Sequence, residues 1–175
     1  MASNLLTLDL ERRLDTLPTE APRRGYIDRA SVPNGEWGTP PELFERCEDI
    51  WGEFTLDPAM NCGQHETYYD NRLLAFHYCG MCGRDGLVLP WASERVFLNP
   101  PYDKTLPLWV ARCAGRAALF TCALLPIRTG RPWWQKHVLT ADAVVYLPGR
   151  LKFVGAENSA PFDSCLVLWW QAPKR

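Results

Sequence analysis

The apolar run over residues 118–125 is the feature that most restricts how this 175-residue chain can fold. A strand that is apolar on both faces must be covered on both sides, which is typical of a parallel sheet between layers of helices. Shorter apolar runs predict further strands. These cover residues 54–56, 95–98, 143–147, 151–154 and 165–170.

Three segments with helical spacing alternate with these strands, covering about 40–52, 106–117 and 132–139. The first has the clearest start, because Thr39 can cap it, two prolines suit its first turn, and Glu42 completes a capping box. The alternation predicts an α/β layered fold, and the closely spaced last strands predict a hairpin-like C-terminal part.

Two parts of the chain have a different character. Residues 1–33 are predicted to form an N-terminal helix, over 4–17, and a linker rich in proline and glycine. The remaining 34–175 form the predicted globular domain, within which 60–90 is a polar insertion containing Cys and His. No apolar run approaches the ~18 residues of a membrane span. Charged residues among the first leucines argue against a secretory signal.

The seven cysteines, an odd number without an export signal, argue against a disulfide framework. Four are predicted to be buried free thiols, because their surroundings are apolar. These are Cys47, Cys113, Cys122 and Cys165.

The insertion contains two ligand-like pairs, Cys62 with His65 and Cys79 with Cys82. A tetrahedral zinc ion needs four such ligands, and paired turns commonly supply them. The pattern predicts a structural zinc site, with His77 as a rival for one ligand position. Reduced free thiols and a redox-active Cys-x-x-Cys pair are the alternatives.

The segment Asn99-Pro100-Pro101-Tyr102 directly follows a predicted strand. The prolines remove two backbone donors and stiffen the turn, so the Asn99 side-chain carbonyl and the Pro100 backbone carbonyl can both act as acceptors. Two converging acceptors suit a planar amino group, and Tyr102 offers an aromatic plane for stacking. The alternative is an ordinary proline-rich strand exit with a buried tyrosine.

At these residues the chain resembles amino-group methyltransferases that use S-adenosylmethionine, whose catalytic motif is Asn-Pro-Pro-Tyr. Five segments in order resemble more specifically the phage-type DNA N-6-adenine methyltransferase (Dam) family. They cover 36–44, 54–57, 99–102, 124–126 and 149–153. The resemblance implies a compact Rossmann-like fold with a mostly parallel sheet and antiparallel C-terminal strands. The Cys/His-containing insertion of this chain is not part of the family's catalytic pattern.

The resemblance also implies roles for residues of this chain. The catalytic residues would be Asn99, Pro100, Pro101 and Tyr102. The residues that bind S-adenosylmethionine would be Trp37, Thr39, Pro40, Asp57, Pro58 and Ala59. An acid at the end of a strand suits that cofactor, because its ammonium and hydroxyl groups donate hydrogen bonds. The chain departs from the wider methyltransferase pattern in having no Gly-x-Gly sequence directly after the acid.

The implied partner is double-stranded DNA, from which the adenine must be flipped out to be methylated. Candidate DNA contacts are Arg128, Arg131, Lys136, Arg150 and Lys152, with Phe153 as a candidate for the second face of the base. Each cation has the alternative of a solvated surface charge, and Phe153 that of a core aromatic. The resemblance also implies a cytoplasmic location in a bacterial cell and a phage or prophage origin.

The formal net charge of −1 conceals an asymmetry that agrees with a DNA partner. Residues 34–98 carry four basic and eleven acidic residues, whereas 99–175 carry ten basic and four acidic ones. The sequence therefore predicts a one-sided basic face with salt-sensitive binding. Two alternatives stay open: a methyltransferase for another amino group (RNA, protein glutamine or cytosine N4), and a non-catalytic zinc-containing DNA-binding module.

Overall fold

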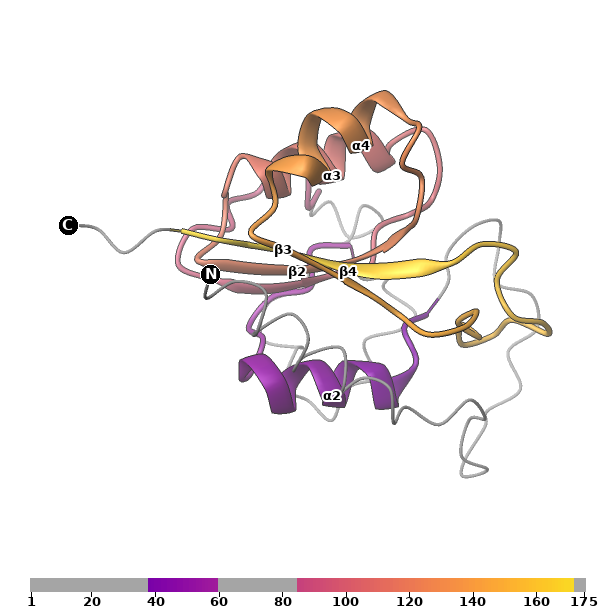
Figure 1. Cartoon of the computed structure of the whole chain (residues 1–175). Coiled ribbons are helices and arrows are strands. Elements are labelled where there is room, and N and C mark those ends of the chain that lie inside the picture. Colours follow the sequence, from indigo (N-terminus) through magenta and orange to yellow (C-terminus); the bar gives the residue numbers. More distant parts are fainter. Residues whose placement is uncertain (1–37, 60–84, 172–175) are drawn as a thin grey trace, which may run out of the picture.

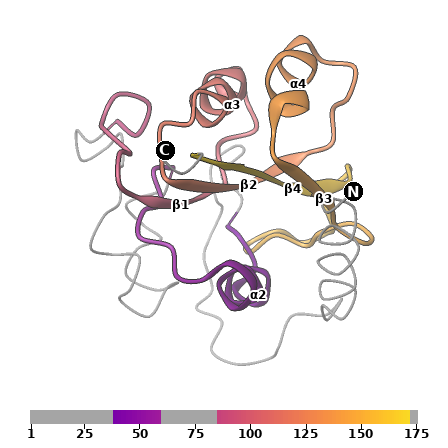
Figure 2. The ribbon, with the colours of Figure 1, turned by 60° about the vertical axis from the view of Figure 1, so that its left-hand side comes forward.

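The computed structural model describes residues 38–59 and 85–171. In these residues a four-stranded sheet has the order β1-β2-β4-β3 (Figure 2). Along the chain the strands are β1 (Arg95–Leu98), β2 (Phe120–Pro126), β3 (Ala143–Tyr146) and β4 (Ser164–Trp170). Every residue of β2 is buried, which confirms the burial on both faces predicted from its apolar sequence.

The sheet combines a parallel and an antiparallel part. β1 pairs with β2 in parallel, while β4 is antiparallel to both of its neighbours, β2 and β3. β1, β2 and β3 therefore run in the same direction and β4 is reversed. Leu56 forms a single parallel bridge with Val96 of β1, so the predicted strand at 54–56 is reduced to one bridge at the border of the sheet.

Helices cover both faces of the sheet, as predicted for an α/β fold (Figure 1). Helix α2 (Pro41–Trp51) lies on one face, and helices α3 (Leu106–Ala114) and α4 (Pro132–His137) lie on the other. A short 3-10 turn, η3 (Val138–Thr140), continues α4. Alternate side chains of each strand point to opposite faces. For example, Leu124 packs in the core under α2, whereas Leu125 packs in the core under α3 and α4.

Helix α2 confirms the first predicted helix but not its predicted cap. The N-cap residue is Pro40, and no side chain caps the helix. A threonine hydroxyl caps the first free backbone N–H groups only from the N-cap position, and Thr39 lies one residue too early. The predicted capping box is therefore wrong, because proline is favoured at the first helical position and Pro41 takes it.

Two other predicted boundaries also differ from the structure. Helix α3 ends at Ala114 rather than at 117, because Gly115 follows and Arg116 adopts a left-handed backbone with φ of 52°. The segment 151–154, predicted as a strand, is a loop with a single antiparallel bridge between Val154 and Gly38. The other predicted strands and helices agree with the structure to within about two residues.

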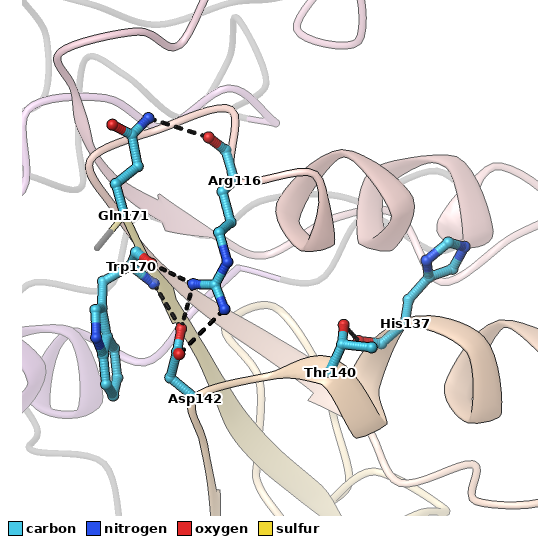
Figure 3. A network of polar contacts seen from close by, with 6 residues as sticks. All are labelled: Arg116, His137, Thr140, Asp142, Trp170 and Gln171. Atoms are coloured by element: carbon cyan, nitrogen blue, oxygen red, sulfur yellow. Dashed lines mark hydrogen bonds and ion pairs between the residues drawn. The ribbon is translucent and has the colours of Figure 1, made fainter. Parts of the chain in front are cut away.

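A polar network closes the end of the sheet where β4 finishes and β3 begins (Figure 3). Asp142, just before β3, accepts hydrogen bonds from the Arg116 guanidinium at 2.5 Å and from the Trp170 backbone N–H at 2.9 Å. The Gln171 side chain donates to the Arg116 carbonyl oxygen at 3.1 Å. The hydrogen bond to Asp142 raises the pKa of Arg116. The network thus joins the end of α3 to β3 and β4.

Several predictions lie outside the described residues. They include the N-terminal helix and linker over 1–33 and the larger part of the 60–90 insertion. Among the described helices, none combines the length and the apolar character that crossing a membrane requires.

Candidate active site

The loops that follow β1, β2 and β3 lie at one edge of the sheet, because these three strands run in the same direction. In open α/β sheets, ligands bind at this carboxyl edge. Asn99 follows β1 directly, and Asp57 follows the Leu56 bridge beside β1. The predicted catalytic motif and the predicted cofactor acid therefore lie on neighbouring chain segments, at the same edge of the sheet.

Tyr102 fixes the turn that follows β1. Its hydroxyl group donates a hydrogen bond to the Leu124 carbonyl oxygen of β2 at 3.1 Å. Burial raises the pKa of Tyr102 well above its ordinary value, so the phenol stays neutral and remains a donor. Pro100 is buried within the same turn, where its missing N–H leaves no unsatisfied donor.

Tyr102, Phe153 and Phe162 form an aromatic cluster. The Tyr102 ring lies edge-on to Phe153, with centroids 5.9 Å apart, and to Phe162, with centroids 5.6 Å apart. Such edge-to-face contacts hold rings in fixed orientations. The guanidinium group of Arg128 lies over the Phe162 ring, 5.4 Å from its centroid. One predicted DNA contact is therefore anchored on a ring that contacts the motif.

Phe153 and Phe162 differ in their access to solvent. Phe153 is 1% exposed, which matches the alternative of a core aromatic, and its contact with a base stays a prediction. Phe162 is partly buried and was not among the predicted site residues. Its position just before the last apolar strand is the one sequence signal that could have indicated it.

Asp57 lies in a tight turn at the end of the chain segment beside β1. Its side chain is buried, and its Oδ1 atom accepts a hydrogen bond from the Ala59 backbone N–H at 3.0 Å. The Phe97 backbone N–H donates to the Leu56 carbonyl oxygen at 3.1 Å and fixes the segment to β1. A carboxylate has several acceptor positions, so its chemistry fits the ammonium and hydroxyl donors of S-adenosylmethionine.

The segment around Thr39 contacts the loop that carries Lys152 and Phe153. The Val154 backbone N–H donates to the Gly38 carbonyl oxygen at 2.9 Å. Thr39 is buried and Pro40 is the N-cap residue of helix α2. Two segments with separate predicted roles, one for the cofactor and one for DNA, are therefore joined directly. The predicted cofactor residue Trp37 lies outside the described residues.

Exposed basic side chains gather in the loops at the carboxyl edge. All five predicted DNA contacts are exposed; Arg128, Arg131, Arg150 and Lys152 lie in these loops, whereas Lys136 lies in helix α4. Lys104, in the loop after Asn99, is a further exposed cation that was not predicted. The loops over 99–105, 127–131 and 147–163 together hold five basic and three acidic residues. We call these three loops the basic edge.

The four predicted zinc ligands, Cys62, His65, Cys79 and Cys82, and the rival His77 lie outside the described residues. In the stretches 38–59 and 85–171, no cluster of three or more His, Cys, Asp or Glu side chains could hold a metal ion.

The four cysteines predicted to be buried free thiols are confirmed as such. Burial raises the pKa of Cys165 to about 12, and it also raises the pKa values of Cys113 and Cys122. These thiols therefore stay protonated near neutral pH. Protonated thiols are poor nucleophiles, so these three are inert, and all four buried cysteines pack as part of the core.

The model of the DNA N-6-adenine-methyltransferase (Dam) family matches residues 30–168. The chain belongs to this family. The match covers most of the chain and includes both the Asp57 turn and the segment from Asn99 to Tyr102. No curated protein matches the chain. Membership in the Dam family makes DNA the expected substrate and methyl transfer to adenine the expected reaction class.

Proposed function

We propose that the chain is a DNA adenine-N6 methyltransferase that uses S-adenosylmethionine and acts on a flipped-out adenine of double-stranded DNA. The main support for the proposal is that this chain belongs to the Dam family and that its Asn99 turn and buried Asp57 lie at the same edge of the sheet, on adjacent segments. The parallel strands β1 and β2, followed by the reversed β4, agree with a Rossmann-like methyltransferase fold.

The proposed chemistry divides between two groups of residues. S-adenosylmethionine would supply an electrophilic methyl group on a sulfonium centre. The residues proposed to hold it are Trp37, Thr39 and Pro40, together with Asp57, Pro58 and Ala59 of the second segment. The Asn99 side-chain oxygen and the Pro100 carbonyl oxygen accept hydrogen bonds from the adenine amino group and orient its nitrogen toward the methyl carbon. When the methyl group moves to nitrogen, the sulfonium sulfur would leave as a neutral thioether, and these acceptors would stabilise the positive charge on nitrogen until its extra proton is released to solvent.

The basic edge supports DNA as the partner. Its exposed arginines and lysines can neutralise phosphates and so position the duplex without reading sequence. Tyr102 would stack on the flipped base. The proposal also includes reaction on DNA in a bacterial cytoplasm and a phage or prophage origin. It further includes a structural zinc ion at Cys62, His65, Cys79 and Cys82.

A substrate comparison tests the proposal against its alternatives. The protein is incubated with methyl-labelled S-adenosylmethionine and with DNA, RNA or protein in parallel. Label in DNA alone supports the proposal, whereas label in RNA or protein would assign the same motif to another amino group. Calorimetry with S-adenosylmethionine then identifies a pure DNA-binding module, which would not bind this cofactor.

A further inference from the structure

Residues 85–91 form a loop that packs directly on the Asp57 turn. Gly86 is buried, and a Cβ atom built on it would lie 1.9 Å from the Pro58 carbonyl oxygen and 2.9 Å from the Trp109 ring. Real Cβ atoms do not approach other atoms so closely, and the nearest neighbour is backbone. Position 86 therefore accepts no side chain unless the turn at Pro58 moves.

Side chains of α3 and of the loop itself hold Gly86 in this position. The Trp91 indole N–H donates a hydrogen bond to the Gly86 carbonyl oxygen at 2.9 Å. Trp91 is 1% exposed and stacks on Trp109 of α3, with ring centroids 6.2 Å apart. The loop is thus attached to the interior of the fold rather than lying loosely on its surface.

Arg112 of α3 adds a second attachment. Its guanidinium group lies over the Trp91 ring, 4.7 Å from the centroid, and donates to the carbonyl oxygens of Leu87 and Leu89. Helix α3 begins only four residues after Tyr102. The loop therefore connects the helix that follows the catalytic motif with the turn that carries Asp57.

We propose that Gly86 is a positioning residue for the cofactor turn: it lets the 85–91 loop support Asp57, Pro58 and Ala59 at the place where S-adenosylmethionine binds. The inference rests on the proposed function. It also accounts for the absence of a Gly-x-Gly sequence directly after Asp57, because a glycine distant in sequence supplies the close backbone approach that such sequences provide elsewhere.

Substitution Gly86→Ala tests this role. The added methyl group must displace the Pro58 carbonyl and so the neighbouring Asp57, and we expect the Kd for S-adenosylmethionine to rise about tenfold or more. The Kd for DNA should stay within about twofold of the wild-type value, because the basic edge is not touched. Calorimetry measures the first and fluorescence anisotropy with labelled duplex DNA the second.

Gly115→Ala is the matched control. A Cβ atom at Gly115 would lie 3.4 Å from its nearest neighbours, and its φ of −71° suits alanine. The control should bind S-adenosylmethionine like the wild type. If Gly86→Ala does so too, or if it weakens both ligands equally, the positioning role is overturned. If the wild type itself does not bind S-adenosylmethionine, it is the proposed function that fails.

A second variant decides the matter if Gly86→Ala does not fold. Trp91→Phe keeps a stacked ring against Trp109 but removes the hydrogen bond to the Gly86 carbonyl oxygen. A smaller rise in the Kd for S-adenosylmethionine, with unchanged DNA binding, supports the proposal. An unchanged Kd for S-adenosylmethionine in the folded Trp91→Phe variant contradicts it.

Discussion

Tyr102 is held at both ends of its side chain. The rings of Phe153 and Phe162 make edge-to-face contacts with the Tyr102 ring. The Leu124 carbonyl oxygen accepts a hydrogen bond from the Tyr102 hydroxyl group. The hydroxyl is thus engaged in structure, which leaves the ring as the part that would serve the substrate. The hydroxyl group and the ring of Tyr102 can therefore be tested separately.

Tyr102→Phe and Tyr102→Ala test that separation. Tyr102→Phe loses one partly buried hydrogen bond, so the free energy of unfolding should fall by about 1 kcal/mol while the methylation rate stays within a few-fold of wild type. Tyr102→Ala removes the stacking plane and should raise the KM for DNA as well. Urea unfolding and initial-rate kinetics measure the two effects. Loss of all methyl transfer in Tyr102→Phe would show that the hydroxyl takes part in the chemistry.

The buried thiol of Cys165 should make the free energy of unfolding depend on pH in the alkaline range. Its thiol has a pKa raised to about 12 from the ordinary value of 9.0, because it is buried. Between these two pH values the folded chain keeps a proton that the unfolded chain has lost. The free energy of unfolding should therefore decrease as the pH rises above about 9.

Urea unfolding at pH 7.5, 8.5, 9.5 and 10.5, each roughly one pH unit apart, measures this dependence. Cys165→Ala should flatten the decrease, although Cys113 and Cys122 will maintain part of it through their own raised pKa values. A decrease of the same steepness in Cys165→Ala would show that this thiol does not titrate as its burial requires.

The network around Asp142 shows how elements are joined far from the candidate site. It connects the end of α3 with β3 and β4, and its ion pair has side-chain exposures of 37% for Arg116 and 21% for Asp142. Partial exposure limits what such a pair contributes, but Asp142 also satisfies the Trp170 backbone N–H.

Asp142→Ala should therefore lower the free energy of unfolding by about 1 kcal/mol without changing the KM for S-adenosylmethionine or DNA. Asp49→Ala is the control, because Asp49 is 66% exposed and lies 3.9 Å from its partner Arg46. It should cost less than about 0.5 kcal/mol. Equal effects of the two substitutions would contradict the structural role of the network. Thermal and urea unfolding provide the measurement.

Most individual helices and strands could be predicted from the sequence, because apolar periodicity and proline or glycine boundaries are local signals. β2 and α2 follow from their own sequences. The errors occur where a distant contact decides the outcome. The segment 151–154 has strand-like residues but gains only one bridge, to Gly38. The support of Pro58 by Gly86 joins two segments across the fold, and no spacing in the sequence indicates it.

The topology of the sheet explains how basic loops come together, whereas a one-sided basic face of the whole molecule stays a prediction. The three loops of the basic edge are distant in sequence but lie together because β1, β2 and β3 share a direction. The segmental charge count, together with the family resemblance, predicts a basic face around Asn99, Arg128 and Lys152. The packing of Arg128 on Phe162 was not predictable, since that contact depends on side-chain packing.

DNA binding should depend on salt through this edge. Arg131→Gln removes one exposed cation, so the slope of log K against log salt concentration should become shallower by about one unit. Glu157→Gln removes an exposed anion from the same edge and should strengthen binding at low salt. Anisotropy titrations between about 50 and 200 mM salt measure both. A slope unaffected by Arg131→Gln would place the duplex elsewhere.

Identifying the methylated base is the most direct test of the proposed adenine-N6 methyltransferase activity. Duplex DNA is incubated with the protein and S-adenosylmethionine, digested to nucleosides and analysed by mass spectrometry. We expect N6-methyladenine with the wild type, and a rate lower by about a hundredfold or more with Asn99→Ala, because the amino group is no longer oriented. Methylation at cytosine N4, absence of any methylated nucleoside, or full activity of Asn99→Ala would contradict it.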